Sequence, residues 1–498
     1  MNVNPITRLD YPDPDVIRVE DTYYMVSTTM HFMPGCEILQ SFDLVHWEHV
    51  TYVYETLDHT DAQQLKSGQN IYGQGMWAAS LRYHEGRFYI CFVANDTRKT
   101  YLYTSEKIDG PWKKQLIEGF YHDGSLLFDE DGRNYIVYGN DEIWITELNE
   151  DLTAPKKGGL HRLLVSDHKN PELGYEGSHI QKINGYYYIF LIHSLRDRWM
   201  RTEACFYSDS LEGEFTGGDV LCDDRGYCGQ GVAQGGIVDT PDGKWYAMLF
   251  QDSGAVGRIP ILVPVTWKDH FPFFGQNGHV PEEIEVHSTR PEYIYQPLVG
   301  SDDFCNGLLP RWQFNHDPDP RYYHLDALQG TYTITTREVC TELTQAVNTL
   351  TQRMSYPSCA AEVTVDASAL KEGDVAGLCA LQSCYAAVGI TKHHGKYEVL
   401  MLDKKEDGIL DMTEGTVVES HQMDFRLEAD FCNMKDEARC YYRVNKGDWL
   451  PIGTVHKLYF KLDHFTGCRF GLFCYAAEET GGSACFRDFK YYDVDEIS

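Results

Sequence analysis

The stretch that decides the fold is Asn184-Gly185-Tyr186-Tyr187-Tyr188-Ile189-Phe190-Leu191, a two-residue turn followed by an aromatic strand. A turn of this kind between apolar segments is typical of a β-hairpin. The same unit occurs five times in the first 270 residues, with aromatic strands expected at residues 22–26, 87–91, 134–138, 187–191 and 245–249. Corresponding tyrosines stand 65, 46, 53 and 58 residues apart. Since a propeller blade takes about 40–50 residues plus loop insertions, five units predict a five-bladed β-propeller.

One position in each repeat, 11 or 12 residues before its tyrosine, is occupied in turn by Asp13, Trp77, Asp123, Glu176 and Gln234. The first strand of every blade lines the central channel of a propeller, so residues just before these strands converge at one mouth of the channel. A single Asp before a strand is more often a turn residue. Three carboxyl groups at equivalent positions, beside an aromatic side chain, indicate a functional site.

Three convergent carboxyl groups suit glycoside hydrolysis. One carboxyl group must protonate the leaving oxygen, and another must deprotonate a water molecule or attack directly. A third carboxylate nearby raises the pKa of the group that has to stay protonated. A non-catalytic sugar-binding propeller is the alternative from another class, and it would explain the aromatic residues but not three convergent acids.

Three motifs resemble those of glycoside hydrolase family 43, namely Tyr11-Pro12-Asp13-Pro14-Asp15, His122-Asp123-Gly124-Ser125 and Tyr175-Glu176-Gly177-Ser178-His179. The resemblance implies an inverting exo-glycosidase that releases a terminal pentose from hemicellulose oligosaccharides. It implies that Asp13 is the general base, that Glu176 is the general acid and that Asp123 raises the pKa of Glu176. In an inverting enzyme the acid and the base stand about 6.5–9.5 Å apart.

The same resemblance suggests the substrate-binding residues. Phe32, Met33 and Trp77 are expected to wall the sugar pocket, Arg258 to hydrogen-bond sugar hydroxyls, and Gln234 to face the pocket from the fifth blade. β-D-xylosidase activity is favoured by the segment at residues 33–35 and by the C-terminal region, with α-L-arabinofuranosidase, or both activities together, as the alternative. A retaining fructosidase is disfavoured because its Asn-Asp-Pro-Asn motif is absent.

The fifth-blade motif bears on whether the chain binds a metal ion. Many members of the family carry a His there that helps to hold a divalent cation near the propeller axis, whereas this chain has Val232-Ala233-Gln234-Gly235-Gly236. We therefore expect no required cofactor and assign no metal ligand, although the amide oxygen of Gln234 could still contact a calcium ion.

The C-terminal third follows a different pattern. Short alternating strands are expected at residues 331–335, 361–365, 397–401 and 469–473, which predicts a β-sandwich. Trp312-Gln313-Phe314-Asn315-His316 is among the segments that resemble the concanavalin-like jelly roll of xylosidase-type members. We predict an all-β chain with a propeller domain over residues 1–298 and a β-sandwich domain over residues 299–498. In the family such a sandwich can narrow one side of the pocket, which favours exo action.

The net charge and the cysteine content limit the kinds of binding partner and the cellular compartment that we expect. The chain has 43 Lys and Arg against 75 Asp and Glu, a net charge of −32, which disfavours nucleic acid and anionic membranes. The expected partner is a neutral xylo- or arabinoxylo-oligosaccharide. No signal-peptide segment is recognisable, and the 15 cysteines lack paired spacing, so a cytoplasmic location is expected. The oligomeric state is not readable from the sequence.

Overall fold

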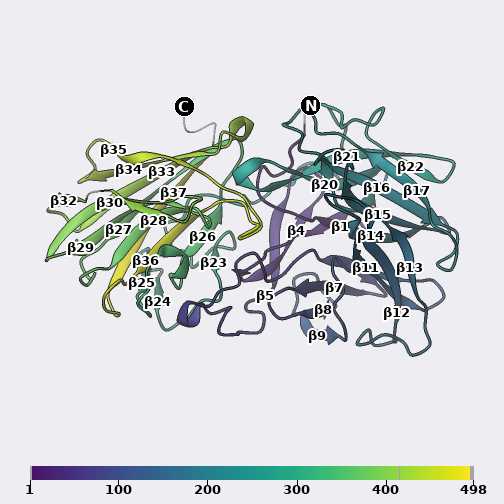
Figure 1. Ribbon diagram of the computed structural model, residues 1–498, viewed down its shortest axis with the longest axis horizontal. Coiled ribbons are helices and arrows are strands. Elements are labelled where there is room, and N and C mark those ends of the chain that lie inside the picture. The colour runs from purple at the N-terminus through teal and green to yellow at the C-terminus, as the bar shows by residue number, and fades with distance from the viewer. Residues whose placement is uncertain (1–2, 414, 494–498) are drawn as a thin grey trace.

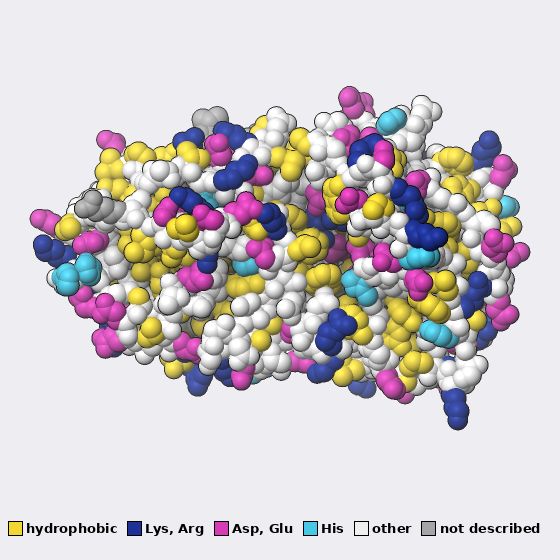
Figure 2. Space-filling model, in the orientation of Figure 1, with side chains coloured by type: hydrophobic (Ala, Val, Ile, Leu, Met, Phe, Trp, Pro, Cys, Tyr) yellow, Lys and Arg dark blue, Asp and Glu magenta, His cyan; other side chains and the backbone are white. Residues whose placement is uncertain are grey.

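The computed structural model describes residues 3–413 and 415–493, and it has two β-rich lobes side by side (Figure 1). The helices in this part of the chain are single 3-10 turns, namely η1 (Lys66–Gly68), η2 (Gly254–Val256), η3 (Leu343–Gln345) and η4 (Cys432–Met434). None of them has the length and apolar character that crossing a bilayer requires. On the face shown in Figure 2, acidic and basic side chains are interspersed over both lobes. The all-β prediction is confirmed.

The N-terminal lobe is a five-bladed β-propeller, as predicted. Four blades are four-stranded antiparallel sheets whose strands follow one another in sequence order, and the fifth blade has five strands. Strand β3 falls within the first blade in sequence but belongs to another sheet. Blade by blade, the strands are β1 (Asp15–Val19), β2 (Thr22–Val26), β4 (Gly35–Ser41) and β5 (Glu48–Tyr54); β6 (Ser80–His84), β7 (Arg87–Ala94), β8 (Lys99–Ser105) and β9 (Lys113–Ile117); β10 (Ser125–Phe128), β11 (Asn134–Asn140), β12 (Glu142–Leu148) and β13 (His161–Ser166); β14 (Glu176–Ile183), β15 (Tyr186–Ser194), β16 (Arg201–Ser208) and β17 (Thr216–Leu221); β18 (Val232–Ala233), β19 (Ile237–Asp239), β20 (Trp245–Asp252), β21 (Arg258–Lys268) and β22 (Phe271–Phe274).

Local chemistry explains the hairpins on which the blades are built. Asn184 and Gly185 have φ angles of 50° and 85°, the two left-handed conformations that a type I′ turn requires, and they join β14 to β15. The inner strands of neighbouring blades contact one another around the axis, since β1 contacts β6 and β19 while β10 contacts β6 and β14. The loops that precede these inner strands therefore meet at one mouth of the channel.

The C-terminal lobe is a sandwich of a nine-stranded and a seven-stranded antiparallel sheet around a large apolar core. The first sheet comprises β3 (Phe32–Met33), β23 (Gln313–Asn315), β26 (Leu350–Arg353), β36 (Arg469–Tyr475), β28 (Val375–Leu381), β29 (Ala386–His393), β30 (Lys396–Lys404), β31 (Leu410–Met412) and β32 (Thr416–Val418). The second comprises β24 (Tyr323–Asp326), β25 (Thr331–Thr335), β37 (Ser483–Asp493), β27 (Ser358–Asp366), β33 (Gln422–Asp430), β34 (Glu437–Val444) and β35 (Leu450–Lys457).

The two lobes share backbone structure. Strand β3 lies within the propeller sequence but pairs with β23, so that the propeller supplies the edge strand of a sandwich sheet. From the other side, buried Arg353 of β26 reaches into the propeller, where it pairs with Glu37 at 2.9 Å and donates to the carbonyl of Asp10 at 2.9 Å. A buried, paired charge fixes geometry because separation would leave both ions uncompensated. The lobes are therefore docked in one defined arrangement.

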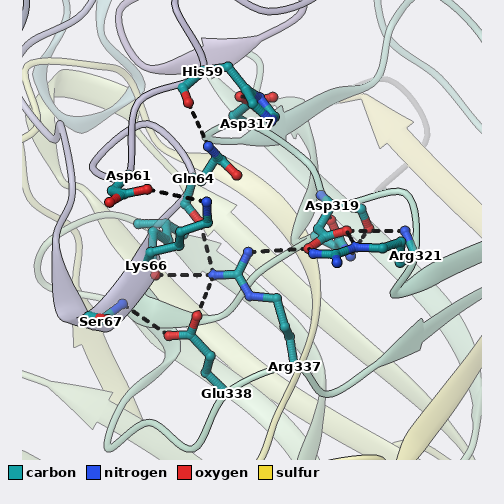
Figure 3. A network of polar contacts seen from close by, with 12 residues as sticks. His59, Asp61, Gln64, Lys66, Ser67, Asp317, Asp319, Arg321, Arg337 and Glu338 are labelled. Carbon is teal, nitrogen blue, oxygen red and sulfur yellow. Dashed lines mark hydrogen bonds and ion pairs between the residues drawn. The ribbon is translucent and has the colours of Figure 1, made fainter.

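A polar network extends this interface along the segment between β5 and β6 (Figure 3). His59 pairs with Asp317, and the guanidinium of Arg337 donates to the carbonyls of Gln64, at 3.0 Å, and Leu65, at 3.3 Å. The partners on this segment belong to the propeller sequence, whereas Asp317 and Arg337 belong to the sandwich. This segment, residues 55–79, thus acts as a strap that links the propeller to the sandwich.

Three buried histidines, His31, His316 and His464, lie together at the junction of the lobes, with the ring centroids of His316 and His464 at 4.8 and 5.9 Å from that of His31. Burial is the main cause that lowers the pKa of His31 and of His316 well below 6.5, and it lowers the pKa of His464 to about 3. The Nε2 atom of His316 accepts a hydrogen bond from the backbone N–H of Ile71 at 2.9 Å, so this nitrogen carries no proton. The cluster is neutral in the folded protein.

Acid is expected to destabilise this junction. Because the folded-state pKa values lie below the unfolded value of about 6.5, the unfolded chain takes up protons first as the pH falls, and stability is lost from about pH 6.5 downward. His464→Phe keeps an aromatic ring at this place but removes one titrating group. The free energy of unfolding should then fall less steeply with decreasing pH, by about 2 kcal/mol in total between pH 7 and pH 5, when urea denaturation of the variant and the wild type is compared. An unchanged slope would contradict this account.

Candidate active site

The three predicted carboxylates meet at the mouth of the propeller channel. Asp13 and Asp123 each stand two residues before an inner strand, β1 and β10, and Glu176 is the first residue of β14. The backbones of Asp13 and Asp123 are left-handed, with φ angles of 53° and 49°. Asp tolerates this conformation better than most residues, and such local strain is found at functional sites where the surroundings hold it in place.

Asp13 is buried and held by two side chains. The hydroxyl of Thr28 donates to one carboxylate oxygen at 2.6 Å, and the guanidinium of Arg258 donates to the other at 3.0 Å. The two contacts fix the position of the carboxyl group, which is what a base that activates water requires.

Asp123 lies between the other two acids and is also buried. Its carboxylate accepts a hydrogen bond from the backbone N–H of Gly177 at 2.9 Å, directly after Glu176. Burial raises its pKa to about 6, the negative charges of Glu176 and Asp13 add to this effect, and His122 opposes it. Because the three carboxyl groups lie close together, the protonation of Asp123 depends on whether Glu176 and Asp13 are charged.

Glu176 is less buried and has two polar neighbours. The amide of Asn140 donates to one carboxylate oxygen at 2.8 Å, and Nε2 of His122 lies 3.4 Å from the same atom. His122 also lies 3.5 Å from Asp123. Burial alone would lower the pKa of His122, but the surrounding carboxylates raise it to about 9. Its imidazolium therefore offsets part of the repulsion between the acids at neutral pH.

Two buried arginines supply positive charge beside the acids. Arg258 begins β21 and bonds Asp13 directly, whereas Arg201 begins β16 and bonds Asp252 at 2.7 Å. Burial alone would lower the pKa of Arg201. Asp252 raises it most, and the nearby charges of Glu176 and Asp13 raise it further. Both guanidinium groups lie 5.3 Å from the ring centroid of Phe250, so they flank the same aromatic side chain.

Aromatic rings border this charged cluster. Trp77, from the loop before β6, has its ring centroid 5.9 Å from that of His122. Phe465 comes from the sandwich, and its centroid lies 5.8 Å from that of Trp77 and 4.1 Å from the guanidinium carbon of Arg258. Flat apolar rings beside carboxylates and guanidinium groups are what a sugar-binding pocket requires.

The side chain of Gln234, from the fifth blade, lies against Gly177, the residue after Glu176. A Cβ atom on Gly177 would lie 2.7 Å from the side chain of Gln234, so a glycine is needed there for the close approach. The backbone N–H of Gln234 donates to buried Glu203 at 2.7 Å. Burial raises the pKa of Glu203 well above its ordinary range. Glu203 thus fixes the backbone of Gln234 from below.

Phe32 and Met33 lie elsewhere than expected. We predicted that they wall the sugar pocket, but they form β3 and pair with the sandwich, at exposed fractions of 2% and 1%. The ring of Phe32 lies 3.4 Å from the guanidinium carbon of Arg469 and belongs to a sandwich core cluster, whereas Met33 packs in a cluster of the propeller. The physical reason is that pairing of β3 with β23 places this segment at the junction between the two lobes, where its side chains are buried. Their role is in docking the lobes.

Sequence reasoning did not assign several residues of the site, namely His122, Asn140, Arg201, Glu203 and Phe465. His122 carried a signal, because it directly precedes Asp123 in a recognised motif. Arg201 stands at the start of an outer strand, where no repeat marks it, and Phe465 comes from the other lobe. Their placement depends on tertiary contacts.

The channel axis below the acids is occupied by the side chain of Arg82. All five of its N–H donors are used, at distances of 2.6–3.2 Å, by Asp15, by the hydroxyl of Ser125 and by the carbonyls of Leu81, Leu126 and Ile180. These partners belong to the first four blades. The second oxygen of Asp15 lies 3.0 Å from Nδ1 of His179. A protein cation thus already neutralises the axial carboxylate, and the axial residues do not fit a divalent metal ion.

His122, Asp123 and Glu176 are the one group of potential metal ligands found among the described residues, with ligand atoms within 4.8 Å of one another. The ring of His122 contacts both carboxylates. Only a neutral imidazole offers a lone pair to a metal, so a metal ion bound here would have to displace a proton from this ring.

Arg82 is therefore expected to be a stability residue. Arg82→Ala leaves buried Asp15 without its main partner, and breaking a buried ion pair costs about 3–5 kcal/mol. Chemical denaturation should show this loss, whereas Arg87→Ala on the exposed end of β7 should change stability by less than about 0.5 kcal/mol. Chelator treatment of the wild type should leave its melting temperature unchanged, and a drop on chelation would contradict the absence of an axial metal.

Buried carboxylates, flanking arginines and an aromatic border at the mouth of a five-bladed propeller define a glycosidase-type site. The family model of glycosyl hydrolases family 43 matches residues 3–272, and the model of the β-xylosidase C-terminal concanavalin A-like domain matches residues 301–492. The chain belongs to glycosyl hydrolases family 43. The predicted family and fold are thereby confirmed.

Relatives and solved structures agree with this assignment. The chain is 26% identical to a β-xylosidase of Formosa agariphila over 99% of this chain and 89% of the relative. It is 24% identical to a xylosidase/arabinosidase of Butyrivibrio fibrisolvens over 99% of both. Among solved structures, a bifunctional protein of Bacteroides eggerthii, described as GH43-CE, superposes with a TM-score of 0.92 at 42% identity over 98% of this chain. The chain spans 63% of the length of that protein.

Proposed function

We propose that the chain is an inverting exo-glycosidase that releases single pentoses from xylo-oligosaccharides, with β-D-xylosides as the favoured substrates. The observation that carries the proposal is the placement of three carboxylates, two arginines and two aromatic rings at one channel mouth, where the ring of Phe465 comes from the sandwich. Relatives named β-xylosidase and xylosidase/arabinosidase support the choice of sugar. A mouth bordered by a second lobe suits a chain end better than the middle of a polymer.

The side chains divide the reaction between them. Asp13, held in place by Thr28 and Arg258, takes a proton from water as that water attacks the anomeric carbon. Glu176 gives its proton to the leaving oxygen, and the glycosidic bond breaks. Asp123 carries a charge beside Glu176, so it favours the protonated form of Glu176 before the reaction. Inversion follows because attack and departure occur on opposite faces of the sugar.

The sugar and the stereochemistry can be tested in one set of assays. Release of p-nitrophenol from the β-D-xylopyranoside and from the α-L-arabinofuranoside names the preferred pentose. Proton NMR of the first-formed product should then show α-xylose from the β-xyloside. β-Xylose as the first product would indicate a retaining enzyme, and inactivity on both substrates would favour a non-catalytic sugar-binding propeller.

α-L-Arabinofuranosidase activity is the second candidate, and it is supported by a relative from Bacteroides ovatus named as a non-reducing end α-L-arabinofuranosidase, 24% identical over 82% of this chain. A kcat/KM on the arabinofuranoside that exceeds the value on the xyloside would reverse the order of the two proposals. Comparable values would indicate one pocket that accepts both sugars.

A further inference from the structure

Two loops from different lobes meet at the aromatic border of the pocket. The propeller loop runs from the end of β5 to Trp77, and the sandwich loop, residues 458–468, lies between β35 and β36 and carries Phe465. Besides lying next to Trp77, Phe465 accepts a hydrogen bond at its carbonyl from Arg258 at 3.5 Å. Its backbone has a φ of 55°, a conformation that an aromatic residue keeps only when its surroundings hold it.

The contact that holds the two loops together lies just before these rings in both loops. Tyr72 and His464 stack face to face, with ring centroids 3.8 Å apart and planes at 3°. Gly73, with φ +67°, lies so close to the sandwich loop that a Cβ atom would stand 2.6 Å from the carbonyl oxygen of Leu462 and 2.8 Å from that of Asp463. The residue after His464 is Phe465 itself, so the stack is one residue from the pocket.

The partners of Tyr72 are also fixed. Its hydroxyl donates to the carbonyl of Thr344 at 2.7 Å and accepts from the amide of Asn315 at 2.7 Å. The neighbouring Ile71 donates its backbone N–H to His316 at 2.9 Å. These partners belong to the sandwich, and the polar strap of Figure 3 continues the attachment toward His59. The propeller loop is therefore bound to the sandwich over most of its length.

We propose that Tyr72 and His464 are positioning residues that set the place of Phe465 in the sugar pocket, so that docking of the sandwich on the propeller determines how tightly the sugar is held. This inference rests on the proposed glycosidase function for its kinetic consequences. The ring contacts and side-chain hydrogen bonds of Tyr72 and His464 in the described part of the chain go to residues other than the three carboxylates, so their effect on catalysis passes through Phe465. A role restricted to holding the lobes together is the competing account.

A double-mutant cycle separates the two accounts. Tyr72→Ala should raise KM on the preferred aryl pentoside about five- to tenfold with a smaller change in kcat, because an aromatic stack of this kind is lost. Phe465→Ala should give a similar change, and the double variant should be no worse than Phe465→Ala alone. Tyr72→Phe keeps the stack and should recover most of the affinity.

Tyr52 provides the matched control. Its hydroxyl also crosses the junction, to the carbonyl of Pro310 at 2.7 Å, but this contact lies outside the two loops. Tyr52→Ala should therefore leave KM within about twofold of wild type, as expected for a residue away from such features. Equal losses in Tyr52→Ala and Tyr72→Ala, or additive losses in the double variant, would overturn the inference.

Hydrogen exchange gives a readout that needs no substrate. The amide of Phe465 donates to the carbonyl of Lys461 at 2.8 Å, and amides of residues 461–468 should exchange at least about tenfold faster in Tyr72→Ala than in Tyr52→Ala. Equal exchange in the two variants would refute the inference. If the wild type is inactive on every pentoside, the proposed function fails, and this exchange comparison still decides whether Tyr72 holds the loop.

Discussion

Glu176→Gln is expected to lower kcat/KM on xylobiose by about 10²–10⁴, because an amide has no acidic proton to give to the leaving oxygen. The substitution keeps the size of the side chain and its contact with Asn140, so folding should be unaffected. The loss should be much smaller on the p-nitrophenyl glycoside, since p-nitrophenolate departs with little help from an acid. The measurement is kcat/KM on both substrates for the variant and the wild type.

The ratio of the two losses is the informative quantity. Glu142→Gln, at the exposed start of β12, is the matched control and should retain wild-type rates on both substrates. If Glu176→Gln lost the same factor on both leaving groups, Glu176 would not act as the general acid. A role in holding the sugar would then be indicated instead.

The propeller could be predicted because its information is local. A turn such as Asn184-Gly185 and the aromatic strand after it determine each hairpin within about ten residues. The regular spacing of the repeats then determines which side chains meet at the channel mouth. Asp13, Asp123 and Glu176 were recognised by position in the repeat before any chemistry was considered, and the structure brings these three together.

Features that depend on contacts with the second lobe have no local signal in the sequence, so the sequence alone does not predict them. Strand β3 has two residues, and its partner β23 begins at Gln313, so nothing local marks it as part of a sandwich sheet. The sequence alone therefore predicts that Phe32 and Met33 are pocket residues, whereas pairing with the sandwich draws both into the junction. Phe465 is the opposite case, because the sequence alone predicts no role for it in the pocket. It follows Trp77 by nearly four hundred positions, yet its ring lies next to that of Trp77.

The missing histidine of the fifth blade has a structural counterpart. The sequence showed a departure from the family pattern at Gln234, and the structure shows that a guanidinium group, from Arg82, lies on the axis and pairs with Asp15. Burial alone would raise the pKa of Asp15, but Arg82 and His179 lower it below its ordinary range. The axial carboxylate of Asp15 is thus already paired with a cation supplied by the protein.

Asp13→Ala is expected to lower kcat by about 10²–10⁴, because the carboxylate that deprotonates the attacking water is removed. Sodium azide should restore part of the activity, since azide is anionic and needs no base. It attacks the anomeric carbon while the leaving group departs with the proton of Glu176, and the expected product from a β-xyloside is the α-xylosyl azide. Product NMR and the rate as a function of azide concentration provide the test.

Removing the Asp13 carboxylate also leaves Arg258 without its partner, so the variant could lose activity through disorder of the pocket. Asp13→Asn preserves the shape of the contact and should be as inactive as Asp13→Ala without azide, while Asp21→Asn, at an exposed hairpin turn, should remain fully active. A β-configured azide product would place attack on the same face as the leaving group. That result, or a variant that retains more than about a tenth of the wild-type kcat, would exclude Asp13 as the base that activates water.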